Sequence, residues 1–341
     1  SPQSFIFPAE FYLLSAIIFL VTENPINHNL SWDDVCIVGL GGHAKNKLIP
    51  GLKAAGLKVI GVVSRDPALA MSGVQIFLNV ADAISSLPKT TLFVIATPPN
   101  VHYAQAKAVI EAGMDVFVEK PAFLSLKESV ELSRLADEHG VVLVEMLMYL
   151  ENNSVQQIIR EIQCAPELVK NIECQFLIPS VPLGTFRTEA SLGNSLLSDM
   201  ACYPLSLLAI AGYNLSNLAL VADDQRAKKN PAFCIRGKSQ QTNIYIRVGC
   251  NGHYRNKVKL KFDVDRQVSC EPFFYGREGH RKLISATSAG MSTDQIHEIN
   301  AYERMFLRKR LEWLAIQESR SAALCLVSDC LERLGRQAGM L

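Results

Sequence analysis

Short apolar runs alternate with segments of helical spacing through residues 32–150. The runs of strand length are residues 35–38, 59–63, 91–96 and 116–118. Residues 101–113 and 126–139 carry apolar side chains at helical spacing, and Gly113 ends the first of these segments. Helices that alternate with short apolar strands predict βαβ units and therefore an α/β domain with a doubly wound parallel sheet of the Rossmann type. Ligands bind just beyond the carboxyl ends of such strands.

The pattern changes from about residue 151, where we expect a second domain. Its predicted elements are a helix (155–162), a strand (171–178), a helix ending near Gly212, two strands (242–248 and 254–264) and two final helices (296–316 and 319–334). Asn251 and Gly252 between the two strands are a β-hairpin signal. The chain is thus divided into an N-terminal extension, a dinucleotide-binding domain and a substrate or dimerisation domain, over residues 1–31, 32–150 and 151–341.

The strand predicted over residues 254–264 has one basic face. Alternate residues of a strand point to opposite faces of the sheet. The basic set is Arg255, Lys257, Lys259 and Lys261, and the apolar set is Val258, Leu260 and Phe262. Such a face is typical of solvent exposure or edge protection. A phosphate-bearing substrate or a subunit partner is the alternative.

The composition is that of an ordered globular chain of 341 residues, with 49% hydrophobic and 20% charged residues. Its 34 basic and 33 acidic side chains nearly cancel, so there is no overall attraction to nucleic acid or to an anionic membrane. The nine cysteines form no C-x-x-C pair, which indicates reduced thiols in a cytoplasmic protein. The seven histidines form no H-E-x-x-H pattern, so we expect no metal site.

The N-terminal extension contains an apolar run that resembles a membrane segment. This run, residues 11–21, is shorter than the roughly 20 residues needed to span a bilayer. The first basic residue of the chain is Lys45, so the basic start of a signal peptide is missing. We expect an additional helix over residues 5–22, packed on the domain or at a subunit contact.

A glycine-rich turn follows the first strand and opens a helix that runs to about residue 55. The sequence Gly39-x-Gly41-x-x-Ala44 fits the G-x-G-x-x-G/A fingerprint in its required strand-turn-helix context. Gly39 permits the tight turn, Gly41 lets the backbone approach a pyrophosphate, and Ala44 allows close helix packing. The amides of Gly42 and His43 lie at the helix N-terminus, where they donate to an anion. This pattern predicts a dinucleotide site; a glycine-rich turn without a ligand is the alternative.

Ser64, Arg65 and Asp66 follow the second strand, where an NAD site expects an acidic residue on the ribose 2′-hydroxyl. A hydroxyl followed by arginine suits a 2′-phosphate, so NADP(H) is favoured over NAD(H). In the alternative interpretation, Asp66 starts the next turn and Arg65 is solvated.

The strand over residues 91–96 ends in a rigid turn at the same sheet edge. We expect Thr97 and Pro98 to line the nicotinamide side of the cofactor. Asn100 is expected to cap the next helix and to belong to the cofactor site. His102, in the first turn of that helix, is expected to be a surface residue.

Lys120 stands where an apolar strand stops at Pro121. Reduction of a carbonyl by hydride needs a proton donor of matched pKa within hydrogen-bond reach. A phenol with a pKa of about 10 is a poor acid unless a neighbouring cation stabilises the phenolate. Lys120 is the candidate for that cation, with Tyr203 as the candidate phenol.

Asp199 lies four residues before Tyr203, so on a helix the two side chains share a face. The carboxylate is then able to orient either the substrate or Lys120. Pro204 cannot donate to the carbonyl of Met200, so we expect it to kink or begin the helix. Alternatively, Tyr203 is a core residue with a satisfied hydroxyl, and Asp199 is a helix cap.

The chain resembles the Gfo/Idh/MocA oxidoreductase family over about residues 33–220. The resemblance rests on the motifs Gly39-x-Gly41-x-x-Ala44, Ala96-Thr97-Pro98-Pro99-Asn100-Val101-His102 and Glu119-Lys120-Pro121. Residues 144–149 are similar to the end of the nucleotide domain in the subgroup of dimeric dihydrodiol dehydrogenase, glucose-fructose oxidoreductase and the nucleotide-sugar ketoreductases. Residues 192–204 resemble the second signature of the family, in which this subgroup carries the tyrosine found at Tyr203.

The resemblance implies a C-terminal α+β domain with an open-faced, mainly antiparallel sheet, and a homodimer or higher homo-oligomer. It implies an NADP(H)-dependent oxidoreductase that acts on a sugar-type carbonyl or hydroxyl, with a nucleotide-linked ketosugar as the favoured substrate. Lys120, Tyr203 and Asp199 are the implied catalytic residues, and Glu119 and Lys120 complete the cofactor site. The alternative is a non-catalytic, NADP(H)-sensing regulatory protein on the same fold.

Two stretches depart from the family pattern. Gly193-Asn194-Ser195 stands where relatives usually have three glycines, and residues 150–153 lack the arginine and proline of many relatives. Both stretches are expected on the substrate side of the pocket.

Overall fold

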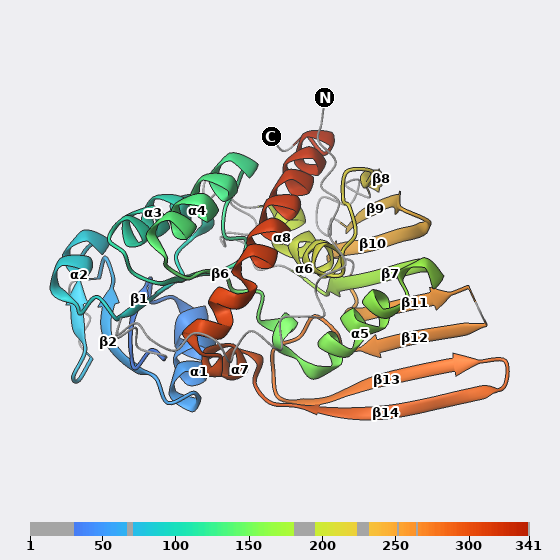
Figure 1. The fold of residues 1–341 in the computed structure, drawn as a ribbon, viewed down its shortest axis with the longest axis horizontal. Coiled ribbons are helices and arrows are strands. Elements are labelled where there is room, and N and C mark those ends of the chain that lie inside the picture. The colour runs from blue at the N-terminus through green and yellow to red at the C-terminus, as the bar shows by residue number, and fades with distance from the viewer. Residues whose placement is uncertain are drawn as a thin grey trace, which may run out of the picture.

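The computed structural model describes residues 31–66, 71–180, 195–223, 232–250, 252–263 and 265–339. These ranges form two sheets joined by helices (Figure 1). The helix expected over residues 5–22 lies outside the described residues. Within the described ranges, no helix has both the length and the apolar character needed to cross a membrane.

The first half of the chain folds around a parallel sheet of strand order β3-β2-β1-β4-β5-β6. Its strands are β1 (Asp34–Val38), β2 (Lys58–Val63), β3 (Gln75–Phe77), β4 (Leu92–Ile95), β5 (Val116–Val118) and β6 (Leu143–Glu145). Its helices are the π-helical η3 (Ala44–Leu48), α1 (Ile49–Ala54), α2 (Val80–Ser86), the 3-10 turn η4 (Pro99–Val101), α3 (His102–Glu111) and α4 (Leu126–His139). This is the Rossmann strand order.

Both faces of the parallel sheet are buried. Along β1, Val35 and Ile37 pack into one hydrophobic cluster, while Cys36 and Val38 pack into a second cluster on the opposite face. A strand covered on both sides has no polar face, which explains why the sequence shows continuous apolar runs here. The predicted α/β class with a doubly wound sheet is confirmed.

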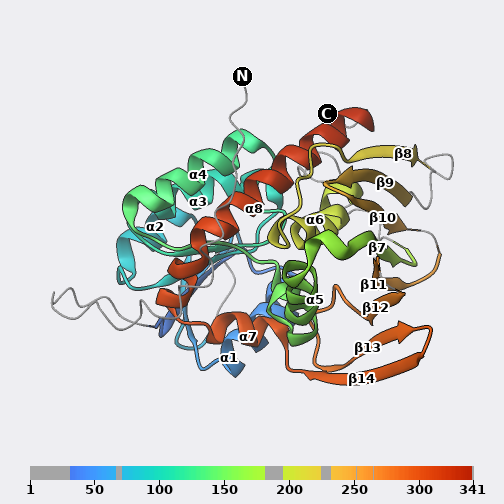
Figure 2. The same cartoon turned by 45° about the vertical axis from the view of Figure 1, so that its right-hand side comes forward.

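The second half folds around a mainly antiparallel sheet of order β14-β13-β12-β11-β7-β10-β9-β8, in which only β7 and β10 pair in parallel among the described strands. Its strands are β7 (Val169–Ile178), β8 (Ala219–Asp223), β9 (Ala232–Ser239), β10 (Thr242–Cys250), β11 (Arg255–Phe262), β12 (Arg266–Glu271), β13 (Gly279–Thr287) and β14 (Gly290–Glu298). The other elements of this half are η5 (Met148–Glu151), α5 (Asn153–Cys164), η6 (Pro166–Leu168) and α6 (Leu196–Ile210). Helices α5 and α6 lie on one face of this sheet (Figure 2). The predicted open-faced sheet is confirmed.

The hairpin predicted at Asn251-Gly252 is wrong. Strands β10 and β11 do not pair with each other, because β7 lies between them and pairs with both. β7 alternates buried residues such as Ile172 and Cys174 with more exposed ones, so it packs its own apolar face into the core between these neighbours. The burial gained by this long-range pairing outweighs the local turn signal.

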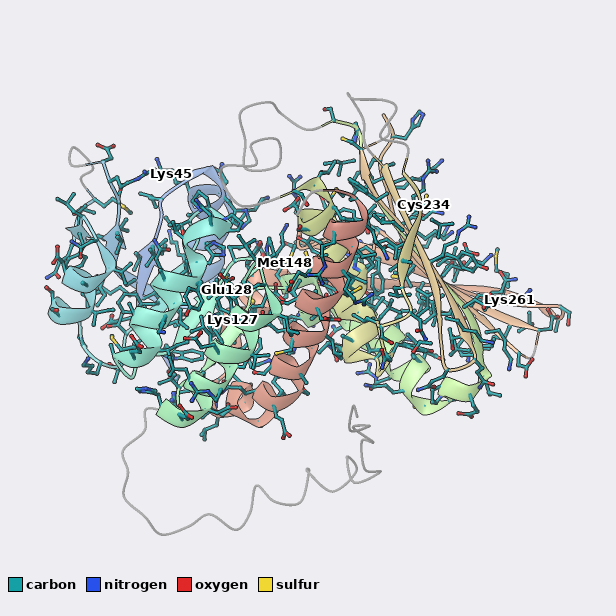
Figure 3. All side chains as sticks on the ribbon, turned by 90° about the horizontal axis from the view of Figure 1, so that it is seen from above. Lys45, Lys127, Glu128, Met148, Cys234 and Lys261 are labelled. Carbon is teal, nitrogen blue, oxygen red and sulfur yellow. The ribbon has the colours of Figure 1, made fainter. Side chains whose placement is uncertain are left out.

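The outward face of the large sheet carries the basic set predicted on β11. Val258, Leu260 and Phe262 are buried, whereas the alternate residues from Arg255 to Lys261 are exposed or half-buried. Figure 3 shows Lys261 on this sheet and Met148 between the two halves of the molecule.

The C-terminal helices differ from the prediction. Residue 296 belongs to strand β14, and the helices are α7 (Ala301–Leu307) and a continuous α8 (Arg310–Gln337). The predicted break near residue 318 is absent, since Gln317 is buried inside α8 and donates to Asp137 while it accepts from the amide of Leu143.

Helix α8 crosses between the two sheets (Figures 1 and 2). Trp313 of α8 packs edge-on against Phe117 of β5, and α8 also packs on α6 of the second half. Helix α7 packs on α1 so closely that a Cβ at Gly51 would lie 2.8 Å from Cβ of Tyr302. The end of the chain therefore completes the core of its first domain.

Candidate active site

A cavity of about 710 Å³ lies where the two halves of the molecule meet. The first half contributes the fingerprint turn, the turn after β4 and the end of β5. The second half contributes an apolar wall that includes Phe176, Tyr203 and Phe274. The volume is in the range typical of small-molecule sites.

Two of the fingerprint glycines differ in why a side chain would be unfavourable: Gly39 is constrained by the protein's own packing, and Gly41 borders the cavity. Gly39 has φ of +93°, and a Cβ there would lie 2.8 Å from Cγ2 of Thr97. The protein's own packing thus requires glycine at position 39. A Cβ at Gly41 would meet no protein atom within 4 Å, and Gly41 lines the cavity. The open space beside Gly41 and the helix N-terminus at Gly42 and His43 fit a dinucleotide pyrophosphate.

Lys120 is held by Asp199. Its Nζ donates to Oδ1 of Asp199 at 2.6 Å and to the backbone oxygen of the same residue at 3.1 Å. The Lys120 side chain is 11% exposed and that of Asp199 is 2% exposed. The two opposite charges therefore form a nearly buried, hydrogen-bonded ion pair.

Tyr203 lies beside this ion pair. The ammonium of Lys120 sits over its ring, 4.9 Å from the centroid, in cation–π geometry. The ring packs against Tyr149, Phe176 and Phe274. Burial raises the pKa of Tyr203 above its usual value, and the charge of Lys120 opposes that rise. A phenol so placed gives up its proton more readily with Lys120 than without it.

Helix α6 brings Asp199 and Tyr203 to one face. Ser195 caps it by accepting from the amide of Ser198, and the helix continues through Pro204 to its end at residue 210. A helix start at Pro204 is therefore wrong, because α6 begins at Leu196, whereas a kink at Pro204 stays a prediction. Residues 193 and 194 of the altered glycine triplet lie outside the described residues.

Glu119 connects the fingerprint to the end of the chain. Its Oε1 is 2.8 Å from Nε2 of His43, and the hydroxyl of Tyr302 lies 3.1 Å from the same nitrogen and 3.4 Å from Oε1. The close contact between α7 and α1 at Gly51 positions Tyr302. The sequence pattern gave no signal for Tyr302, since helix α7 reaches the pocket only through tertiary packing.

The turn after β4 carries Thr97 and Pro98 into the cavity wall, together with Pro99. Asn100 lies within the 3-10 turn before α3 and is exposed, while Val101 occupies the N-cap, so the predicted cap by Asn100 is wrong. Asn100 is also absent from the cavity lining.

His102 is buried, not at the surface as predicted. Its Nε2 lies 2.7 Å from the oxygen of Thr97, and its Nδ1 lies 3.2 Å from the oxygens of Pro121 and Ala122. Burial lowers its pKa, and the carbonyl contacts act in the opposite direction. The imidazole joins the turn after β4 to the turn after β5, so it fixes the cavity wall on either side of Lys120.

Ser64 and Arg65 follow β2 at the carboxyl edge of the parallel sheet. Ser64 accepts from the amide of Asp66 at 3.1 Å, and neither Ser64 nor Arg65 lines the cavity. In a Rossmann site the adenosine ribose lies near the end of this strand. The position is consistent with contact to that end of a cofactor.

The unusual stretch at residues 150–153 faces the junction between the halves and does not line the cavity. Glu151 is buried and accepts from Arg308 and Arg320 at 2.7 and 2.9 Å. Asn152 donates to the oxygen of Tyr275 at 2.7 Å. These residues therefore do not border the cavity themselves. They contact the segments that carry Tyr275, Arg308 and Arg320.

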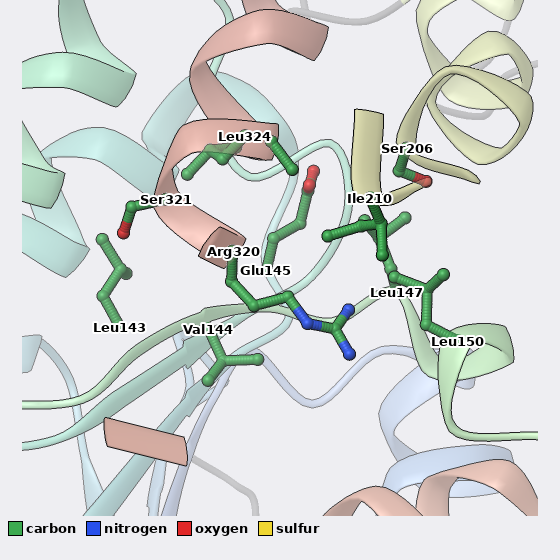
Figure 4. A pocket seen from close by; sticks show the side chains of 11 residues that line it. Leu143, Val144, Glu145, Leu147, Leu150, Ser206, Ile210, Arg320, Ser321 and Leu324 are labelled. Atoms are coloured by element: carbon green, nitrogen blue, oxygen red, sulfur yellow. The ribbon is translucent and has the colours of Figure 1, made fainter. Parts of the chain in front are cut away.

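Glu145 lies behind the turn that follows β5, at a second, small cavity of about 20 Å³ (Figure 4). Its carboxylate accepts from the amide of Ala122 at 3.0 Å and so supports the turn after Lys120. Figure 4 shows its side chain and that of Arg320 pointing in different directions. Burial raises the pKa of Glu145 to about 7.

Residues 34–146 match the profile of the oxidoreductase family with an NAD-binding Rossmann fold. A dTDP-3,4-didehydro-2,6-dideoxy-alpha-D-glucose 3-reductase from Streptomyces antibioticus is 27% identical over 50% of this chain and 53% of its own length. An uncharacterized oxidoreductase from Rhizobium meliloti is 28% identical over 50% of the chain and 53% of its own length. The chain thus spans about half the length of these curated relatives.

Solved structures match over most of the chain. KijD10, a 3-ketoreductase from Actinomadura kijaniata in complex with NADP and TDP-benzene, has a TM-score of 0.74 at 15% identity, covering 90% of this chain and 98% of its own. An aldose-aldose oxidoreductase from Caulobacter crescentus has a TM-score of 0.74 at 13% identity, with the same coverage. At such identities the matches establish the two-domain fold. Together with the profile match, they confirm the resemblance found in the sequence.

Proposed function

We propose that the chain, whose residues 34–146 match the profile of the Gfo/Idh/MocA oxidoreductase family, is an NADP(H)-dependent oxidoreductase acting on a sugar-type carbonyl or hydroxyl. The observation that carries the proposal is the grouping of Lys120, Asp199 and Tyr203 at the cavity that opens from Gly41. A nucleotide-linked ketosugar is the favoured substrate.

In this proposal Tyr203 exchanges the proton with the substrate oxygen. Lys120 lowers the free energy of the phenolate and polarises the same oxygen, which is stabilisation of charge that develops during the reaction. Asp199 orients Lys120, as the 2.6 Å contact supports. NADP(H), when bound, supplies or accepts the hydride. The apolar wall of Phe176 and Phe274 excludes water and strengthens these charge interactions.

The cofactor preference rests on Ser64 and Arg65. A guanidinium after β2 suits the dianionic 2′-phosphate, whereas no acidic residue precedes it to accept from a 2′-hydroxyl. The remaining cofactor contacts are proposed at Gly39, Gly41, Gly42, His43 and Ala44, at Thr97, Pro98 and Asn100, and at Glu119 and Lys120.

The test has two stages. Fluorescence titration with NADPH and NADH comes first, and we expect the tighter binding for NADPH. A turnover screen with nucleotide-linked ketosugars and free sugars follows, with Tyr203→Phe as the inactive comparison. Binding of NADPH without turnover on any compound would favour the regulatory alternative, and no binding at all would indicate a vestigial site.

A further inference from the structure

Two basic side chains face the interdomain cavity without a carboxylate partner among the described residues. Lys47 comes from η3, just after the fingerprint, and Arg277 comes from the turn between β12 and β13. The single carboxylate among the described lining residues is Glu119, which contacts His43 and Tyr302. Lys120, by contrast, has Asp199. The cavity lining therefore holds an excess of positive charge in addition to the ion pair of the proposed reaction.

The two cations act on each other. Lys47 is half-buried, and burial lowers its pKa, with a smaller contribution from the charge of Arg277. Like charges held near one another in a partly desolvated site disfavour the charged state, and a bound anion removes that penalty. The pair is thus arranged for an anionic ligand.

Arg277 stands on a firmly held turn. Arg281, which is 1% exposed, donates through Nη2 to the oxygens of Tyr275 and Arg277 at 3.3 and 2.6 Å. The guanidinium of Arg281 also lies 5.2 Å from the centre of the Tyr275 ring. Asn152 donates to the oxygen of Tyr275 as well. A buried guanidinium that binds the carbonyls of Tyr275 and Arg277, on either side of Gly276, fixes the direction in which the Arg277 side chain leaves the backbone.

Lys47 and Arg277 lie apart from the proposed binding site of the cofactor pyrophosphate. The amides of Gly42 and His43 already form a pyrophosphate cradle at the start of the helix. Lys47 lies four residues beyond His43, one turn further along the helix, and Arg277 belongs to the opposite, second-half wall. An anion that contacts both side chains must therefore lie between the two walls of the cavity.

We propose that Lys47 and Arg277 form an anion subsite that binds a phosphate group of the substrate. This inference rests on the proposed function, because it requires that the second half of the cavity holds the substrate. It specifies the substrate class as a phosphorylated sugar derivative, either a sugar phosphate or a sugar linked to a nucleotide diphosphate. Neutral sugars lack the group that this subsite binds.

The test uses the full chain, with Lys47→Gln, Arg277→Gln and the double variant. Matched controls are Lys45→Gln, on the same helical turn but exposed and outside the cavity lining, and Arg255→Gln on the outer face of the sheet. Calorimetric titration with inorganic pyrophosphate is run with and without saturating NADPH. We expect affinity to fall roughly tenfold for each cation removed and to stay unchanged in both controls.

A fluorescence titration with NADPH distinguishes the two sources of phosphate. We expect the double variant to bind NADPH within about twofold of the native protein, because the amide cradle is intact. If its NADPH affinity falls about tenfold while NADPH-saturated native protein binds no pyrophosphate, the cations serve the cofactor and the inference is wrong. Equal pyrophosphate affinity in native and double-variant protein would overturn it too.

The same variants separate this inference from the proposed function. In the turnover screen, we expect KM for a phosphorylated substrate to rise about tenfold or more in the double variant, with kcat much less affected. If no compound turns over, the proposed function fails, yet the pyrophosphate titration still decides whether the anion subsite exists.

Discussion

The two walls of the interdomain cavity differ in the kinds of residues that line them. The wall from the parallel sheet includes turns with small side chains at Gly41, Gly42 and Thr97, and beside them the charged side chains of Lys47, Glu119 and Lys120. The wall from the second half includes large aromatic side chains, namely Phe176 of β7, Tyr203 of α6 and Phe274 of the turn between β12 and β13. Contacts made by the backbone depend little on which side chains are present, so they suit a group that is common to many reactions. Contacts made by side chains change with single substitutions. The first wall therefore suits the cofactor and the second the substrate.

Removing the reacting group from the second wall should have the largest effect. We expect Tyr203→Phe to lower kcat by about 10²- to 10⁴-fold, because the proton donor is lost while the ring packing is kept. Steady-state kinetics measure the loss of turnover, and an NADPH titration measures whether cofactor affinity is kept. Unchanged turnover on the true substrate would exclude the proton role. A large fall in NADPH affinity would instead place Tyr203 in the cofactor site.

The first wall can be tested at two glycines, because the fold requires glycine at position 39 and does not require it at position 41. Gly41→Val should lower NADPH affinity by roughly tenfold or more, since the added side chain occupies the proposed pyrophosphate space, and it should leave thermal stability nearly unchanged. Gly39→Val should lower the free energy of unfolding by about 1–3 kcal/mol, because φ is positive and Thr97 lies in the way. Thermal melts and titrations of both variants give the comparison. Equal destabilisation of the two would contradict it.

The junction behind the two walls gives a pH-dependent prediction. Burial raises the pKa of Glu145 from its usual value of 4.5 to about 7 in the folded protein, so folding takes up a proton between these pH values. Its stabilising contribution is complete below about pH 4 and is lost as pH rises through about 7. Glu145→Gln should thus become more stable relative to the native protein as pH rises from 5 to 8, by on the order of 2 kcal/mol. Denaturant unfolding at several pH values measures this difference, and a pH-independent difference would argue against the raised pKa.

A smaller effect is expected where the first wall meets the adenosine end of the cofactor. Arg65→Gln should reduce the preference for NADPH over NADH by about tenfold, through weaker NADPH binding alone. Titrations with both cofactors test it, with Lys58→Gln as an exposed control at the start of β2, the strand that Arg65 follows. A native preference for NADH would contradict the interpretation of Ser64 and Arg65.

The smallest effect on the cavity is expected from the outer face of the large sheet. We expect the chain to form a homodimer, as the open face of this sheet suggests. Light scattering after gel filtration gives the oligomeric state, and Lys259→Glu tests the face because it reverses a charge at its centre. If the protein is a monomer at all concentrations, the prediction of a homodimer is wrong and the open face of the sheet is exposed to solvent.

The first wall was largely predictable from sequence because each of its turns follows a short apolar strand. Glycine spacing, the Thr97-Pro98 turn and Lys120 are all local signals at strand ends, and parallel strands bring such ends to one edge. His102 was mispredicted because its burial depends on the carbonyls of Pro121 and Ala122, which are about 20 residues away.

The second wall was only partly predictable. Asp199 and Tyr203 were found through the resemblance of residues 192–204 to a family signature, and their spacing placed them on one helix face. Phe274, Arg277 and Tyr302, by contrast, reach the cavity through strand order and helix packing. The same sheet explains the failed hairpin, since β7 separates the two strands that the Asn251-Gly252 signal joined. Periodicity predicts which face of a strand is buried, and it does not predict the neighbour of that strand.

The helices at the end of the chain have a consequence for synthesis on the ribosome. Trp313 and Tyr302 pack against Phe117 and α1, so residues translated about 190 positions after β5 close the first core. At about 5–20 residues per second, the nascent parallel sheet waits roughly 10–40 s for these helices. During that interval the apolar surface around Phe117 is a target for chaperones. We therefore expect this protein to need folding assistance more than a chain whose domains are completed one after the other.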